Sequence, residues 1–158
     1  MVLHGWRAGG TGSNQTDWVV GKPEFGDFIL SFGFRVSGSG YAGVGVRLPG
    51  LEPAGNGSLA AQGYEFRISD SDDDNPTGSI LDLARAFRLG PDLKLIVHKE
   101  QWNQARLYVA GDHIVSHVNL VKMAETHANR RSAGRIGFEV APRTIIEYRD
   151  LQVKRIAP

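Results

Sequence analysis

The sequence lacks cysteine, long apolar runs and a surplus of charge, and each absence excludes a class of protein. Without cysteine the chain has no disulfide, no thiol nucleophile and no thiolate metal site, and its redox compartment is left open. No stretch approaches the length of a membrane span, and the N-terminus has no basic segment followed by an apolar run. We therefore expect a protein that stays inside the cell, or one whose signal was removed before this chain begins.

Charge is balanced along the chain. Eighteen Lys and Arg residues stand against seventeen Asp and Glu residues, which gives a net charge of +1. Neither sign gathers into a long block, so neither nucleic acid nor a membrane surface is the expected partner. The sequence leaves the oligomeric state open.

Glycine is abundant instead, with 20 residues among 158, and aromatic residues are spread along the chain. Such a composition suits short strands joined by turns better than a helical bundle. The length fits one domain of ordinary size, and no linker interrupts the chain. Residues 1–158 are therefore expected to form a single domain.

Alternating apolar residues predict most of the secondary structure. A period of two over residues 28–36 predicts a half-buried strand, and extended structure resumes at 41–48 and 63–69. Further strands are expected at 93–98, in a hairpin of 102–109 with 112–119, and at 135–140 and 144–156, whereas 120–133 reads as irregular. Short strands without long helices predict an all-β fold, a two-sheet antiparallel β-sandwich or jelly roll.

The strand at 63–69 carries charge on one face. Alternation places Glu65 and Arg67 on the same side, opposite the apolar residues. Arg47 ends the glycine-rich strand at 41–48, so a carboxylate and two guanidinium groups are expected to approach one surface. From the residues alone, the same pattern is also that of an ion pair on the solvated face of a sheet.

Three aspartates alternate directly after this strand, at Asp70, Asp72 and Asp74. Alternate aspartates begin a calcium loop, because they turn several oxygens toward one hard cation. An EF-hand requires Gly at its sixth position and Glu at its twelfth, where this chain has Asn75 and Leu81. Two interpretations stay open, a calcium site of another kind and an exposed turn.

A series of short motifs follows in order from Trp18 to Ile156. The clearest are Phe25-Gly26-Asp27-Phe28, Gly63-Tyr64-Glu65, Trp102-Asn103, Gly134-Arg135-Ile136-Gly137 and Tyr148-Arg149-Asp150-Leu151. In this order and spacing they resemble the 3-keto-disaccharide hydrolase family, which has a concanavalin A-like jelly roll.

The resemblance implies a carbohydrate ligand on a concave sheet face, and cleavage of glycosides that are already oxidised at C3. A base removes the acidified C2 proton, an enolate forms and the C1 oxygen leaves before water adds back. The resemblance implies Glu65 as the general base and Arg47 as its electrostatic partner. It also suggests a divalent cation, with calcium as the candidate, and an extracytoplasmic location if a signal was removed. The candidate substrate-binding residues are Arg67, Tyr41, Glu139, Trp102 and Asn103.

Two of these candidates are aromatic. Trp102 is either a core residue of its hairpin or a stacking platform for a sugar ring. Tyr41 stands where the family has a polar residue, at the mouth of the glycine-rich strand, and its ring is placed to stack on a pyranose.

The chain departs from the family pattern at several polar positions. Arg67 and Glu139 both stand where the family favours Gln, and Leu120 replaces the Gly of an Asn-Gly turn. If Glu139 faces the same surface, it forms a carboxylate pair with Glu65 that raises one pKa, while Arg67 opposes that shift. The alternative function is a noncatalytic carbohydrate-binding or adhesion module on the same scaffold.

Overall fold

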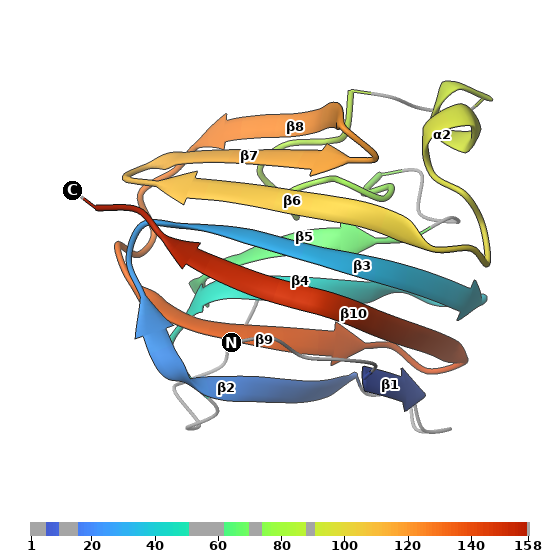
Figure 1. Ribbon diagram of the computed structural model, residues 1–158, viewed down its shortest axis with the longest axis horizontal. Coiled ribbons are helices and arrows are strands. Elements are labelled where there is room, and N and C mark those ends of the chain that lie inside the picture. The colour runs from blue at the N-terminus through green and yellow to red at the C-terminus, as the bar shows by residue number, and fades with distance from the viewer. Residues whose placement is uncertain (1–5, 10–15, 51–61, 70–73, 88–90, 158) are drawn as a thin grey trace.

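The structure is a computed structural model that describes residues 6–9, 16–50, 62–69, 74–87 and 91–157. Two antiparallel sheets pack face to face, which confirms the predicted two-sheet β-sandwich (Figure 1). The described residues contain one short helix, α2 (Pro91–Ile96), which lies beyond one end of the sheets. No helix among them is long and apolar enough to cross a membrane.

The larger sheet has six strands in the order β1-β10-β3-β6-β7-β8. Every neighbouring pair is antiparallel. The bounds of its strands are β1 (Trp6–Gly9), β3 (Phe28–Gly38), β6 (Asn103–Ala110), β7 (His113–Val118), β8 (Val121–His127) and β10 (Thr144–Arg155).

The smaller sheet has four strands in the order β2-β9-β4-β5, and it lies behind the larger one in Figure 1. Its strands are β2 (Asp17–Phe25), β4 (Ala42–Leu48), β5 (Tyr64–Ile68) and β9 (Gly134–Val140). Residues 78–81 run beside β5 and exchange backbone hydrogen bonds with Glu65 and Arg67. This segment covers the edge of the sheet next to the charged strand.

The core lies between the two sheets and follows the predicted alternation. Every second residue of β3 from Phe28 to Phe34 has no exposed surface. Across the core, the rings of Phe32 on β3 and Phe66 on β5 meet edge to face, with centroids 5.8 Å apart. Since Phe66 points inward, its neighbours Glu65 and Arg67 point to the outer face of the four-stranded sheet. That outer face is covered as well, because all residues of β4 and β5 are buried.

Two local predictions are wrong. Residues 93–98, expected as a strand, contribute to α2, because Leu93 and Ile96 are three apart and pack together on the core as one helical face. Residues 120–133, expected to be irregular, contain β8, which pairs with β7 and buries Met123 and Ala124. The hairpin of β6 and β7 and the closing strands β9 and β10 are where the alternation predicts them.

Candidate functional site

Four polar side chains form the Glu65 cluster, which consists of Tyr41, Glu65, Arg67 and Glu139. Strand register brings them together, because Gly43 of β4 is the cross-strand partner of Arg67 on one side and of Glu139 on the other. The cluster therefore spans three adjacent strands of the four-stranded sheet. Its charged members are nearly inaccessible, with exposed fractions of 1% for Glu65 and 6% each for Arg67 and Glu139.

Glycine at position 43 makes room for the cluster. Glu65 lies over Gly43, and a Cβ placed there would overlap the Oε1 atom of Glu65. A side chain at this position would therefore separate Glu65 from Glu139, which lies on the next strand. The glycine-rich sequence of β4 provides the floor of the site.

The Glu65 carboxyl has two kinds of charged neighbour. Nη2 of Arg67 donates a hydrogen bond of 3.0 Å to Oε2 of Glu65 within the buried region. Burial nevertheless raises the pKa of Glu65 to about 10, together with a hydrogen bond to Glu139 and the charge of Glu139, and the Arg67 charge opposes the rise. With its pKa raised in this way, Glu65 is protonated at neutral pH and lies beside the carboxyl of Glu139.

Tyr41 closes the cluster on its half-buried side. Its ring centroid lies 3.9 Å from the guanidinium carbon of Arg67, in the geometry of a cation–π contact. Burial and then the charge of Glu139 raise the pKa of the Tyr41 hydroxyl, so the phenol stays protonated. Tyr41, Glu65, Arg67 and Glu139 were all candidate residues from the sequence, and the structure brings these four together.

Two further residues interact electrostatically with the cluster and were missed by sequence reasoning. The charge of Asp82 contributes to the raised pKa of Glu65. The phenol of Tyr148 is buried in the core, and burial followed by the charges of Glu65 and Glu139 raises its pKa well above the usual value. Asp82 carries no signal in the sequence, because only the return of residues 78–81 along β5 brings it near.

Arg47 does not join the cluster, so the expectation that it shares a face with Glu65 is wrong. It adopts a φ of 52° at a bulge, where the register of β4 and β9 shifts between Gly45 and Leu48. The bulge reverses the alternation, and the side chain of Leu48 lies against Gly45 instead.

The guanidinium of Arg47 is 1% exposed and holds together chain connections at one end of the sandwich. Its acceptors are the carbonyls of Gly26, Gly111 and Arg131 and the Oδ1 atom of Asp27. With its donors used in this way, Arg47 is a structural residue rather than a partner for an enolate.

The structure also separates Trp102 and Asn103 from Glu65, because both residues belong to the six-stranded sheet side. Trp102 lies between two guanidinium groups, 4.9 Å from that of Arg35 and 4.1 Å from that of Arg149. Asn103 is buried, and its amide bonds to the backbone of His98 and Gln101 and to Asn119. Asn103 therefore orders the connection before β6.

Of the three aspartates in the predicted calcium site, the structure describes only Asp74. Asp70 and Asp72 lie outside the described residues, and Asp74 is exposed. Across the described part of the chain, no group of three or more His, Cys, Asp or Glu side chains is arranged to hold a metal ion. Calcium binding at Asp70, Asp72 and Asp74 stays a prediction.

Several solved structures with this fold are described as glycosyl hydrolases or carbohydrate-binding modules. A "putative glycosyl hydrolase" from Parabacteroides distasonis has a TM-score of 0.78 at 11% identity, over 97% of this chain and 81% of the other. A second one from the same organism has a TM-score of 0.71 at 16% identity, over 95% and 90%. The carbohydrate-binding module CBM66 of Bacillus subtilis has a TM-score of 0.66 at 14% identity, over 98% and 94%. These similarities show the jelly-roll fold.

The fold and the family together define a carbohydrate-related β-sandwich domain. The chain belongs to the family of the 3-keto-alpha-glucoside-1,2-lyase-like domain, whose sequence model matches residues 2–154. This match confirms the resemblance to 3-keto-disaccharide hydrolases. A comparison with curated protein sequences gave no match.

Proposed function

We propose that this protein cleaves 3-keto-glycosides at the Glu65 cluster, by elimination followed by hydration. The observation that carries the proposal is the pair of buried carboxyls, Glu65 and Glu139, beside the guanidinium of Arg67, with the pKa of Glu65 raised by burial and by its neighbour Glu139. Such a pair contains an acid and a base at the same pH. The family to which the chain belongs supports this reaction class.

The reaction needs one proton removed and one proton supplied. A carboxylate takes the proton from C2, which the C3 keto group acidifies, and the negative charge moves to the C3 oxygen as an enolate. When the enolate returns its electrons, the C1–O bond breaks and the departing oxygen takes a proton. Water then adds to the resulting C1–C2 double bond, with its hydroxyl on C1 and a proton on C2.

The cluster has a group for each of these tasks. Because the raised pKa of Glu65 keeps a proton on it, Glu65 is proposed as the acid that protonates the leaving oxygen and Glu139 as the base. This changes the role of Glu65 from the base expected from the sequence. Arg67 supplies the positive charge that stabilises the enolate, in a buried site where such a charge acts strongly. The pair of Glu65 and Glu139 contains one proton before and after elimination. The two carboxyls can therefore exchange their acid and base roles for the hydration step.

Tyr41 marks the side from which the sugar approaches. It is half-buried, whereas the three charged members are buried, and its ring already packs on Arg67. A pyranose that replaces part of this contact would reach both carboxyls through one opening. Tyr41 is therefore proposed as the residue that binds the sugar ring.

The deep burial of the cluster favours one competing function, a noncatalytic carbohydrate-binding module. Glu65 is 1% exposed, and an ion pair that serves only the fold is also found in such surroundings. The fold similarity to the module CBM66 supports this second candidate. It predicts saccharide binding without turnover.

Release of nitrophenolate from a 4-nitrophenyl 3-keto-α-glucoside tests the proposed function. We expect turnover by the wild type and a loss of about 100-fold or more in Glu139→Gln, because a general base is removed. The matched control is Glu147→Gln, since Glu147 also pairs with an arginine, Arg35, but on the other sheet. Binding without release favours the module, and release that is equal in Glu65→Gln, Glu139→Gln and wild type places the chemistry elsewhere.

A further inference from the structure

We propose that the outer face of the six-stranded sheet is a second binding site, specific for an acidic saccharide whose carboxylate or sulfate groups contact Arg106 and Lys154. The site, called the outer groove, consists of two adjoining cavities of about 260 and 310 Å³. Its polar lining residues are Ser31, Gln104, Arg106, His117, Gln152 and Lys154.

Strand register makes the two cavities one continuous groove. Ser31 of β3 is the cross-strand partner of Gln152 on β10 and of Arg106 on β6, and Arg106 in turn pairs with His117 on β7. The two cavities share Ser31 and Arg106. With a spacing of about 4.8 Å between strands, the row from Gln152 to His117 extends roughly 14 Å, which suits an oligosaccharide.

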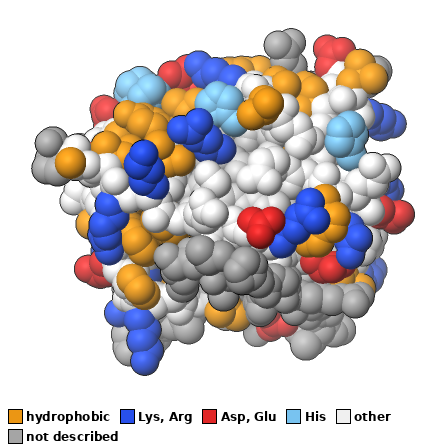
Figure 2. All heavy atoms as spheres, in the orientation of Figure 1, with side chains coloured by type: hydrophobic (Ala, Val, Ile, Leu, Met, Phe, Trp, Pro, Cys, Tyr) orange, Lys and Arg blue, Asp and Glu red, His pale blue; other side chains and the backbone are white. Residues whose placement is uncertain are grey.

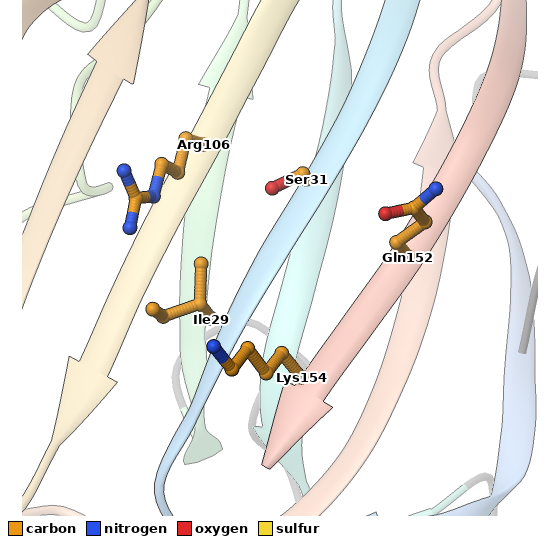
Figure 3. Close-up of a pocket in the computed structure, with 5 residues that line it drawn as sticks. All are labelled: Ile29, Ser31, Arg106, Gln152 and Lys154. Carbon is orange, nitrogen blue, oxygen red and sulfur yellow. The ribbon is translucent and has the colours of Figure 1, made fainter. Parts of the chain in front are cut away.

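The floor of the groove is small and its borders are positive. Figure 3 shows the short side chain of Ser31 between the long side chains of Arg106 and Gln152, with Lys154 on the same strand as Gln152. In Figure 2, uncharged side chains and backbone form much of the middle of this face, with one acidic side chain at the lower edge of this area and Lys and Arg side chains around it. A chain of polar rings could lie on such a floor with its acidic groups at the borders.

Positive charge is in surplus at the groove. The neighbouring carboxylates of Glu125, Glu147 and Asp150 on this sheet are each paired with another cation. Arg106 and Lys154 form no ion pair with any carboxylate in the described part of the chain. Two unneutralised cations that flank one cavity are complementary to an anion.

The pKa of His117 is sensitive to this positive environment. Burial, followed by the charges of Arg106 and Lys122, lowers the pKa of its imidazole. A bound carboxylate or sulfate would counteract both charges and raise the pKa of His117. The pKa of His117 can therefore be used to detect an anion bound in the groove.

Leu120 adds a strained, exposed apolar contact at the end of the groove. It lines the cavity that contains His117, is 96% exposed and adopts a φ of 68° in the turn after β7. Leucine is unfavourable in this conformation, where glycine is preferred, so Leu120 lowers the stability of the folded protein. The strain is accounted for if Leu120 packs on the apolar face of a bound sugar.

The arrangement favours a saccharide over other anionic partners. Nucleic acid and membrane surfaces are bound by extended arrays of cations, whereas this groove is lined by two cations together with neutral amide, hydroxyl and imidazole groups and the apolar Ile29. The whole chain has a net charge of only +1. Two cations next to neutral hydrogen-bonding groups match an oligosaccharide with some acidic units.

Binding of trigalacturonate, measured by calorimetry and by NMR titration of His117, tests the proposal. We expect binding of trigalacturonate but not of neutral maltotriose, a raised pKa of His117 in the complex, and a loss of about tenfold in affinity for Arg106→Gln and for Lys154→Gln. Lys94→Gln is the control, because Lys94 is an exposed cation on α2 that lines neither cavity. Leu120→Gly should raise the midpoint of thermal unfolding and weaken trigalacturonate binding.

The proposal is overturned if trigalacturonate does not bind, or if Lys94→Gln weakens it as much as Arg106→Gln does. If vesicles with anionic lipid or duplex DNA bind as tightly as trigalacturonate, the groove attracts anions in general and is not specific for a saccharide. Unchanged affinity in Leu120→Gly would remove Leu120 from the site. Nitrophenolate release from the 3-keto-glucoside is expected to be unchanged in Arg106→Gln, so failure here is distinguishable from failure of the proposed function.

Discussion

Replacing Glu65 by glutamine should make the stability of the protein less dependent on pH. In the folded protein the pKa of Glu65 is about 10, against a usual value of 4.5 in an unfolded chain. Because the folded pKa is the higher one, the stability contributed by the bound proton is complete below about pH 4.5 and is lost as the pH rises toward 10. Glutamine keeps the neutral shape without a proton to lose.

The size of the effect follows from the shift. Each pH unit inside this window changes the free energy of unfolding by up to about 1.4 kcal/mol, so between about pH 5 and pH 8 the variant should gain up to roughly 4 kcal/mol relative to wild type. Urea unfolding of Glu65→Gln and wild type at several pH values measures this difference. Glu147→Gln is the control, because Glu147 is partly exposed and its pair with Arg35 lies on the other sheet. A difference between Glu65→Gln and wild type that stays constant with pH would refute the raised pKa of Glu65.

Three further predictions concern the surroundings of the cluster. Arg47→Met should lower the free energy of unfolding by about 4 kcal/mol in urea, because the carbonyls of Gly26, Gly111 and Arg131 and the Asp27 carboxylate lose the buried guanidinium that joins them; a loss below about 1 kcal/mol would contradict the structural role. Gly43→Ala should cost roughly 2–3 kcal/mol and weaken the pH dependence of stability, since the methyl group displaces Glu65, and an unaltered urea curve would contradict the packing. Millimolar calcium should raise the melting temperature if the aspartates at 70–74 bind it, and an unchanged melting temperature removes that site.

Alternation made much of the architecture predictable. In β3 the large apolar residues recur at every second position, so the strand and its buried face could be read from the sequence. The same period placed Glu65 and Arg67 on one face, and the structure joins them by a hydrogen bond from Arg67 to Glu65. Glu139 was expected to meet Glu65 only if both strands faced the same surface, a condition that depends on the pairing of β4 with β9.

The failures have local physical causes. Leu93, Ile96 and Val97 fit the spacing of one helical face as well as an apolar strand, and a run this short does not separate the two. The bulge at Arg47 is a feature of backbone pairing that side-chain periodicity does not reveal. Asn103 was identified by its motif, but a motif does not distinguish an amide that binds sugar from one that is bonded to its own backbone.

Incorporation of solvent deuterium at C2 of a 3-keto-glucoside tests the central claim most directly, because it follows the proton that the Glu65–Glu139 pair is proposed to move. In heavy water, NMR of the wild-type reaction should show C2 deuterium in the product 3-keto-glucose. Glu139→Gln should slow this exchange by about 100-fold or more, since the base is missing. Exchange at C2 or product formation that is equally fast in Glu139→Gln would contradict the account.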